Sequence, residues 1–202
     1  MNVKDWRVKI PGCLLALLLS VVCAVGATVQ DYADKIAPLI DPAKLAELRE
    51  RGANQRVQKI TYYLYSAKKD RLDATAVARA AVKDVRMKKA AGDLTVLAMM
   101  RNVRIAEQLG CTDAAGLSEM RKGNAATVRF GPYAGDQLSV DHIIPFSVVP
   151  ELDKVIANLE LMPSRMNSKK SASVGQRQRD LATKLNKAGL LSDVGLRAVA
   201  SR

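Results

Sequence analysis

The sequence has little of several residue types on which enzymes and small exported domains often depend. Its 202 residues include three cysteines, one tryptophan and one histidine, and aromatic residues make up 4%. A single histidine excludes a metal centre built from several histidines, and the lack of a CxxC pair excludes the usual structural zinc site. The sequence also lacks a glycine-rich phosphate loop, a heptad run and an internal repeat, which excludes P-loop enzymes, coiled coils and solenoids.

Long apolar runs are absent too, with one exception close to the start of the chain. The run at 13–25 is followed by Gly26-Ala27 and is preceded by three basic residues, Lys4, Arg7 and Lys9. It is short compared with the ~20 residues that a membrane-spanning helix needs. We therefore predict a secretory signal peptide over 1–27, and an exported protein that is periplasmic or secreted. The alternative is an uncleaved leader, and only then do we expect the membrane as a partner.

Cleavage of this leader after Ala27 would leave one cysteine, because Cys13 and Cys23 lie within it. The remaining Cys111 cannot form an intramolecular disulfide, so the domain must be stabilised by its apolar core. The chain has no second histidine to activate a thiol. We interpret Cys111 as a buried or helix-end residue rather than a nucleophile.

Residues 28–122 have the apolar periodicity of helices, and we expect a small helical bundle. Gly92-Asp93 is predicted to break a helix, and Gly110 to end one. Apolar residues recur at spacings of three and four in three stripes, which we assign to the core: Val57, Ile60, Leu64 and Ala67; Val77, Ala81 and Val85; Val96, Met99, Met100, Val103 and Ala106.

Basic residues outnumber acidic ones by 32 to 20, which gives a formal net charge of +12 and points to a polyanionic partner. The excess is concentrated at 163–189. After Gly175 we expect an amphipathic helix, whose apolar stripe contains Leu181, Leu185 and Ala188. Three of its basic residues are candidates for phosphate contacts, and the sequence does not choose among them: Arg177, Arg179 and Lys184.

Between these regions the sequence alternates in the manner of strands. The alternation around Leu138 and Val140 predicts a strand that Pro145 closes, and 158–162 predicts a second strand that Pro163 stops. Ser164 is then predicted to cap a helix that carries Asn167 in its first turn. The order strand, loop, strand, helix brings Asp141 and His142 to a strand end, with Asn167 facing back toward it.

These residues suggest a hydrolytic site. His142, the only histidine, follows a carboxylate and precedes Ile143-Ile144-Pro145, a context that favours a general base over a core residue. A carboxylate from Asp141 and an amide oxygen from Asn167 suit a hard cation such as Mg²⁺ rather than zinc.

Together, Asp141-His142, Asn158 and Asn167 resemble the HNH, or ββα-metal, nuclease motif, in the variant with Asn at the last position. The resemblance covers roughly 125–175 and leaves the helical region unexplained. It implies that His142 is the base, that Asp141 and Asn167 hold one divalent cation, Mg²⁺ or Mn²⁺, and that Asn158 fixes the loop behind the His142 ring. It also suggests basic contacts to substrate phosphates, namely Arg165, Lys169 and Lys170.

We therefore predict an α+β, mostly α protein, with an N-terminal helical bundle, a ββα-metal (HNH) nuclease motif and a C-terminal helix. The predicted divisions are a signal peptide at 1–27, a helical region at 28–122 and an HNH-like nuclease domain at 123–202. The expected activity is metal-dependent endonucleolytic hydrolysis of nucleic acid, with DNA favoured over RNA and no structural zinc. Two alternatives are a non-catalytic basic nucleic-acid-binding protein with a degenerate motif, and a periplasmic helical adaptor.

Overall fold

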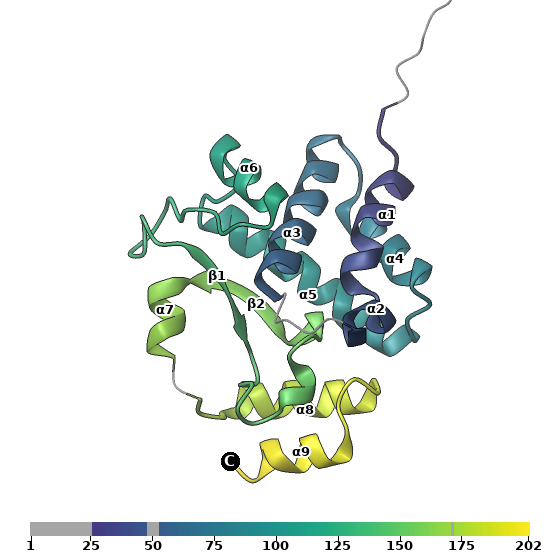
Figure 1. Ribbon diagram of the computed structural model, residues 1–202, viewed down its shortest axis with the longest axis vertical. Coiled ribbons are helices and arrows are strands. Elements are labelled where there is room, and N and C mark those ends of the chain that lie inside the picture. The colour runs from purple at the N-terminus through teal and green to yellow at the C-terminus, as the bar shows by residue number, and fades with distance from the viewer. Residues whose placement is uncertain (1–25, 48–52, 171) are drawn as a thin grey trace, which may run out of the picture.

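The computed structural model describes residues 26–47, 53–170 and 172–202 (Figure 1). Helices predominate, and the one sheet found in these ranges has two antiparallel strands, so the chain is α+β and mostly α. The predicted signal peptide lies outside the described residues, apart from Gly26 and Ala27. Across the same ranges, no helix is both long and apolar enough to span a membrane.

The helical region supplies α1 Val29–Ile40, α2 Pro42–Glu47, α3 Ala53–Lys69, α4 Ala74–Asp84, α5 Lys89–Gln108 and α6 Ala114–Lys122. Local side chains set several of the helix starts. The Thr28 side chain accepts the Asp31 N–H at the start of α1, and Asp73 accepts the Thr75 N–H at the start of α4. Each bond satisfies a backbone donor that has no partner within its own helix.

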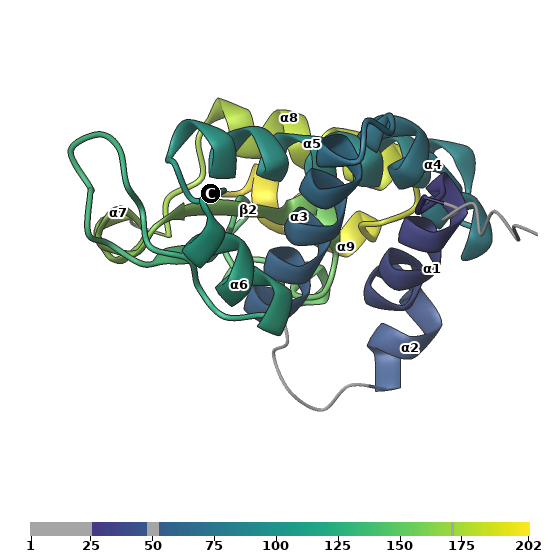
Figure 2. The ribbon, with the colours of Figure 1, turned by 90° about the horizontal axis from the view of Figure 1, so that it is seen from above.

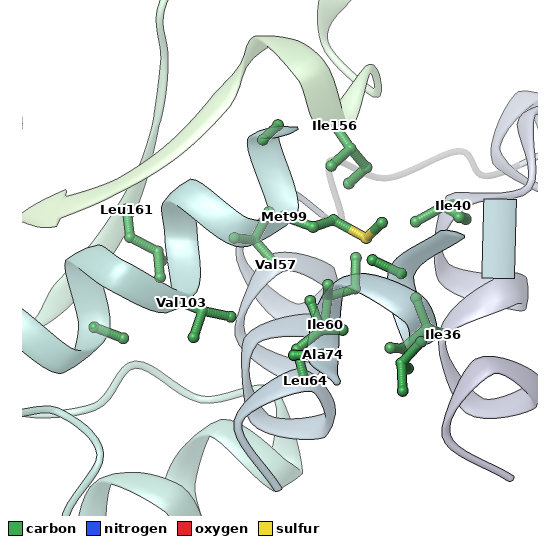
Figure 3. Packing of buried hydrophobic residues seen from close by; sticks show 14 of the residues in the cluster. Ile36, Ile40, Val57, Ile60, Leu64, Ala74, Met99, Val103, Ile156 and Leu161 are labelled. Carbon is green, nitrogen blue, oxygen red and sulfur yellow. The ribbon is translucent and has the colours of Figure 1, made fainter. Parts of the chain in front are cut away.

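The three predicted apolar stripes belong to one core cluster, against whose edge Val85 and Met100 pack partly buried. Figure 3 shows side chains of α3 and α5 that meet in it. Ile60 and Leu64 of α3 pack with Met99 of α5, and all three side chains are buried. The same cluster continues into Ile156 and Leu161 beyond the helical region. The helices and the segment with the proposed motif therefore share a single core.

The predicted break at Gly92-Asp93 is wrong, because α5 runs through it without interruption. A Cβ added at Gly92 would lie 2.5 Å from Val82 Cγ1. The glycine thus allows α4 and α5 to approach closely, and its intrinsic cost to the helix is offset by that packing.

The hairpin consists of β1 Leu138–His142 and β2 Leu159–Pro163, with Val140 opposite Leu161 and Asp141 opposite Glu160. The predicted order of two strands and a helix is found, with α7 Ser164–Lys169 after β2. Two short 3-10 helices, η1 Pro150–Leu152 and η2 Ile156–Asn158, lie in the connection.

The predicted helix cap at Ser164 is wrong by one residue. Pro163 takes the N-cap position, where it makes no side-chain capping bond. The Ser164 N–H instead donates to the Gln137 carbonyl at 2.9 Å, so its backbone is tied to the chain before β1.

Two buried polar side chains bind the hairpin to the helices. Gln58 of α3 donates to the Leu138 carbonyl at 2.6 Å. Asn102 of α5 donates to the Leu159 carbonyl at 3.2 Å and accepts the Leu161 N–H at 2.9 Å. The two Asn102 bonds supply β2 with partners on the side away from β1, so α5 acts as a polar neighbour of the strand.

The chain ends in two helices, α8 Gln176–Lys187 and α9 Asp193–Ala200, of which α9 was not predicted. Leu185 of α8 and Val199 of α9 pack with Ile144 and Leu152 in a second apolar cluster. Helix α8 also contacts α5 (Figures 1 and 2). The basic helix is thereby placed beside the end of the hairpin.

Candidate active site at the end of the hairpin

A pocket of about 170 Å³ opens where β1 ends. It is lined by Asp141, His142, Pro145, Phe146, Lys170 and Ala172. Alternation along a strand would send Asp141 and His142 to opposite faces, but both border this pocket because the strand ends here.

Asp141 is buried, with 8% of the residue exposed, and its carboxylate is paired with a cation from the protein. The Lys170 ammonium contacts Asp141 Oδ2 and donates to the His142 carbonyl at 3.0 Å. Lys170, predicted to contact a substrate phosphate, is therefore placed on the carboxylate that was predicted to hold the metal.

His142 is oriented by a residue that the sequence did not single out. Its Nε2 lies 3.0 Å from Asp153 Oδ1 and 3.3 Å from the Asp153 carbonyl. Because both of these oxygens are acceptors, Nε2 is the donor, and Nδ1 is the ring nitrogen left to accept a proton. Asp153 lies in the connection between the strands, where its spacing from His142 follows no motif.

Asn158 is fully buried and locks the chain just after β1. Its Oδ1 accepts the Ile144 N–H at 2.8 Å, and its Nδ2 donates to the Ile144 carbonyl at 3.0 Å. Because the amide binds both backbone groups of one residue, it holds the loop that leaves His142 in a single conformation.

Asn167 faces β1, as predicted. Its Nδ2 donates to Ser139 Oγ at 3.2 Å and to the Val140 carbonyl at 3.4 Å. Ser139 and Asp141 are two residues apart on one strand and point to the same face. The Asn167 amide therefore lies on the face that carries Asp141, with its nitrogen turned to the strand.

The other two predicted phosphate contacts lie within α7, Arg165 in its first turn and Lys169 at its last residue. Arg165 forms an ion pair with Asp136 (Nε to Oδ1, 2.7 Å), and its backbone N–H also donates to Asp136, at 2.9 Å. Its guanidinium lies 5.8 Å from the centre of the Tyr133 ring. Lys169 is exposed at the end of the helix.

The pocket offers a hard divalent cation one carboxylate, that of Asp141, and the carbonyl oxygen of His142. The Lys170 ammonium is a stand-in for it, since it shows that Asp141 and the His142 carbonyl accommodate a positive charge. Asn167, the other predicted ligand, is not among the residues that line the pocket, and its Nδ2 is bonded to β1. Its carbonyl oxygen is a neutral donor of the kind that such ions accept. In the described ranges, the candidate site included, no group of three or more His, Cys, Asp or Glu residues is placed to hold a metal.

Glu160 is a further acidic residue at the hairpin that the sequence analysis passed over. It is buried, with 6% exposed, and its carboxylate receives two hydrogen bonds from Arg177. A charged residue inside the apolar run at 159–162 was the available signal, because such a position requires a buried partner.

Comparison of the chain with protein-family models, curated proteins and solved structures gives no match.

Proposed function

We propose that this protein is an exported, metal-dependent endonuclease that hydrolyses phosphodiester bonds, with DNA as its preferred substrate. The observation that carries the proposal is the pocket that Asp141 and His142 both border, in which Asp153 orients the histidine. A carboxylate for a cation and an imidazole for a proton are the two groups that metal-assisted hydrolysis of a phosphodiester needs.

The proton is taken by Nδ1 of His142 from the water that attacks phosphorus. Asp153 accepts the Nε2 hydrogen bond throughout, so it favours the charged imidazolium that forms and keeps the ring in place. A divalent cation held by Asp141 and Asn167 supplies positive charge to the phosphate and the leaving oxygen when bound. Asn158 maintains the loop geometry on which the His142 position depends.

The proposed contacts with the substrate are to its phosphates, from Arg165 and Lys169, and from Lys170 once a cation has displaced it from Asp141. Such contacts position a nucleic acid but carry no sequence information, and we identify no base-reading element. We therefore propose cleavage that is largely independent of sequence and weakens with salt.

Nicking of supercoiled plasmid by the purified mature chain tests the proposal, with millimolar Mg²⁺ or Mn²⁺ and with EDTA. The His142→Ala variant should cleave roughly 10²–10⁴-fold more slowly, the usual loss when a general base is removed, with unchanged circular dichroism and DNA affinity. Cleavage near the wild-type rate would remove His142 from its role.

A non-catalytic DNA-binding protein is the second candidate, because Asp141 already has a cationic partner in Lys170. It predicts duplex binding with no nicking under any metal condition, so the same assay separates the two functions.

A further inference from the structure

A second ion pair, between Glu160 and Arg177, lies on the same face of the hairpin as the pair of Asp141 and Lys170. Asp141 and Glu160 are opposite each other in the two strands, so their side chains point the same way. Two buried carboxylates in this arrangement repel unless each has a cation, and here Lys170 pairs with Asp141 while Arg177 pairs with Glu160.

Glu160 holds Arg177 with good geometry from α8. Arg177 Nη1 donates to Glu160 Oε1 at 2.9 Å, and Arg177 Nη2 donates to Oε2 at 2.5 Å. These hydrogen bonds raise the pKa of the Arg177 guanidinium, and the charges of Glu160 and Asp141 act in the same direction. Arg177 is therefore fixed within electrostatic range of the proposed metal carboxylate.

The Arg177 side chain is anchored and yet accessible. It is 59% exposed, and a bidentate contact uses two of the five N–H donors of a guanidinium. The contact with Glu160 leaves the other three donors unused. This differs from Arg101, whose Nη2 donates to the Leu159 carbonyl at 3.1 Å and whose Nε lies 3.7 Å from Glu160 Oε2.

An open pocket of about 430 Å³ adjoins these arginines between α5 and α8. Three cationic side chains and one carboxylate line it, together with two apolar residues: Arg101, Arg177, Lys184, Asp180, Ile143 and Leu181. His142 lines the candidate active site and Ile143 lines this pocket, so the two pockets are bordered by consecutive residues of the chain.

We propose that the pocket of Arg101, Arg177 and Lys184 is a second subsite, which binds a backbone phosphate of the nucleic-acid strand next to the one that is cleaved. The proposal rests on the proposed function and extends it to α8. It also selects among the three basic residues of α8 that the sequence left open as phosphate contacts: Arg177 and Lys184 line the pocket, whereas Arg179 is about 200° around the helix from Arg177.

Duplex binding measured without cleavage tests this subsite. In a His142→Ala background with EDTA, fluorescence anisotropy of a labelled duplex would be followed over a range of salt concentrations. The variants are Lys184→Gln, which changes an exposed residue, and Glu160→Gln combined with Arg177→Gln, which leaves no unpaired buried carboxylate and keeps the net charge. The matched control is Arg179→Gln, which removes one charge from the same helix.

Both pocket variants should bind three- to tenfold more weakly, and the slope of log affinity against log salt should fall by about 0.9 for one lost phosphate contact. The control should stay within twofold. If both pocket variants match the control, the subsite is overturned while the proposed function stands. If the wild-type chain neither binds nor nicks DNA, the proposed function fails and the subsite fails with it. Circular dichroism identifies a misfolded double variant, in which case Lys184→Gln alone decides.

Discussion

At the scale of single residues, the candidate site is a set of opposite charges held close together. The sequence analysis pointed to Asp141, His142, Asn158 and Asn167 because their types and order suit one chemistry. Their hydrogen-bond partners could not be read in the same way. The contact between His142 and Asp153 depends on how the connection between the strands folds back, and no local pattern specifies that path.

Lys170 should compete with the divalent cation for Asp141. Its ammonium contacts the carboxylate directly, so a metal ion must displace it. The Lys170→Met variant should bind Mn²⁺ about tenfold more tightly than the wild type in the absence of DNA, a change that corresponds to ~1.4 kcal/mol. Electron paramagnetic resonance of free Mn²⁺ measures this. Lys169→Met removes the same charge from an exposed position and should have no such effect, and equal affinities in all three proteins would contradict the prediction.

Cys111 should be unreactive in the folded protein. The residue is fully buried, as the sequence analysis anticipated, and burial raises the pKa of its thiol to about 11. At pH 8 the thiolate, which is the reactive form, is therefore scarce as well as inaccessible. A thiol reagent such as DTNB should label the mature chain only after denaturant is added. Rapid stoichiometric labelling of the native protein would show that this region opens.

At the scale of elements, the periodic patterns predicted the helices and strands well. Single residues that are typical of helix ends predicted the element boundaries less well. The stripes of α3 and α5 are buried as expected because a helix of this period must cover one face. Gly92 was misread as a break because close packing on Val82 and a helix end both call for glycine. The N-cap of α7 was predicted at Ser164, one residue after its observed position at Pro163, because only the tertiary structure shows the bond between the Ser164 backbone and Gln137.

Asn102 should be the polar residue of α5 on which the hairpin most depends. Its amide makes two hydrogen bonds to β2 in a buried setting. The Asn102→Ala variant leaves the Leu161 N–H without a partner, while the Leu159 carbonyl keeps its bond from Arg101. A buried unsatisfied group costs about 1–3 kcal/mol. Urea denaturation should show a free energy of unfolding lower by roughly 1–3 kcal/mol. The exposed Asn124→Ala serves as the control, and equal losses in the two variants would show that the bonds to β2 add nothing.

At the scale of the whole molecule, the helical region is bound into the same core as the hairpin. Leu138, Leu159 and Leu161 pack in the cluster that α3 and α5 form, and Gln58 and Asn102 add buried hydrogen bonds. The helices thus support the two strands that carry the candidate site. Because a two-stranded hairpin is marginally stable alone, this support explains why a small motif comes with a long helical region.

The leader should be absent from the mature protein. Its apolar run is too short to span a membrane and ends in small residues, which favours cleavage after Ala27. Mass spectrometry of protein recovered outside the cytoplasm should therefore find a chain that begins at Thr28. In the structure, the Thr28 side chain caps α1, so the first residue after the predicted cleavage site already belongs to the fold. Full-length chain in the membrane fraction would instead support an uncleaved anchor.

By itself, the sequence determined the fold class, α+β and mostly α, the positions of most elements and the choice of residues for the candidate site. These properties depend on local order: helix and strand periods, turn residues, and four polar residues at a characteristic spacing. The tertiary structure decided which charges are paired. That Lys170 lies on Asp141, Asp153 on His142, and Arg177 on Glu160 depends on contacts between segments 11 to 29 residues apart. The positions of both partners in such contacts are set by packing on a common core.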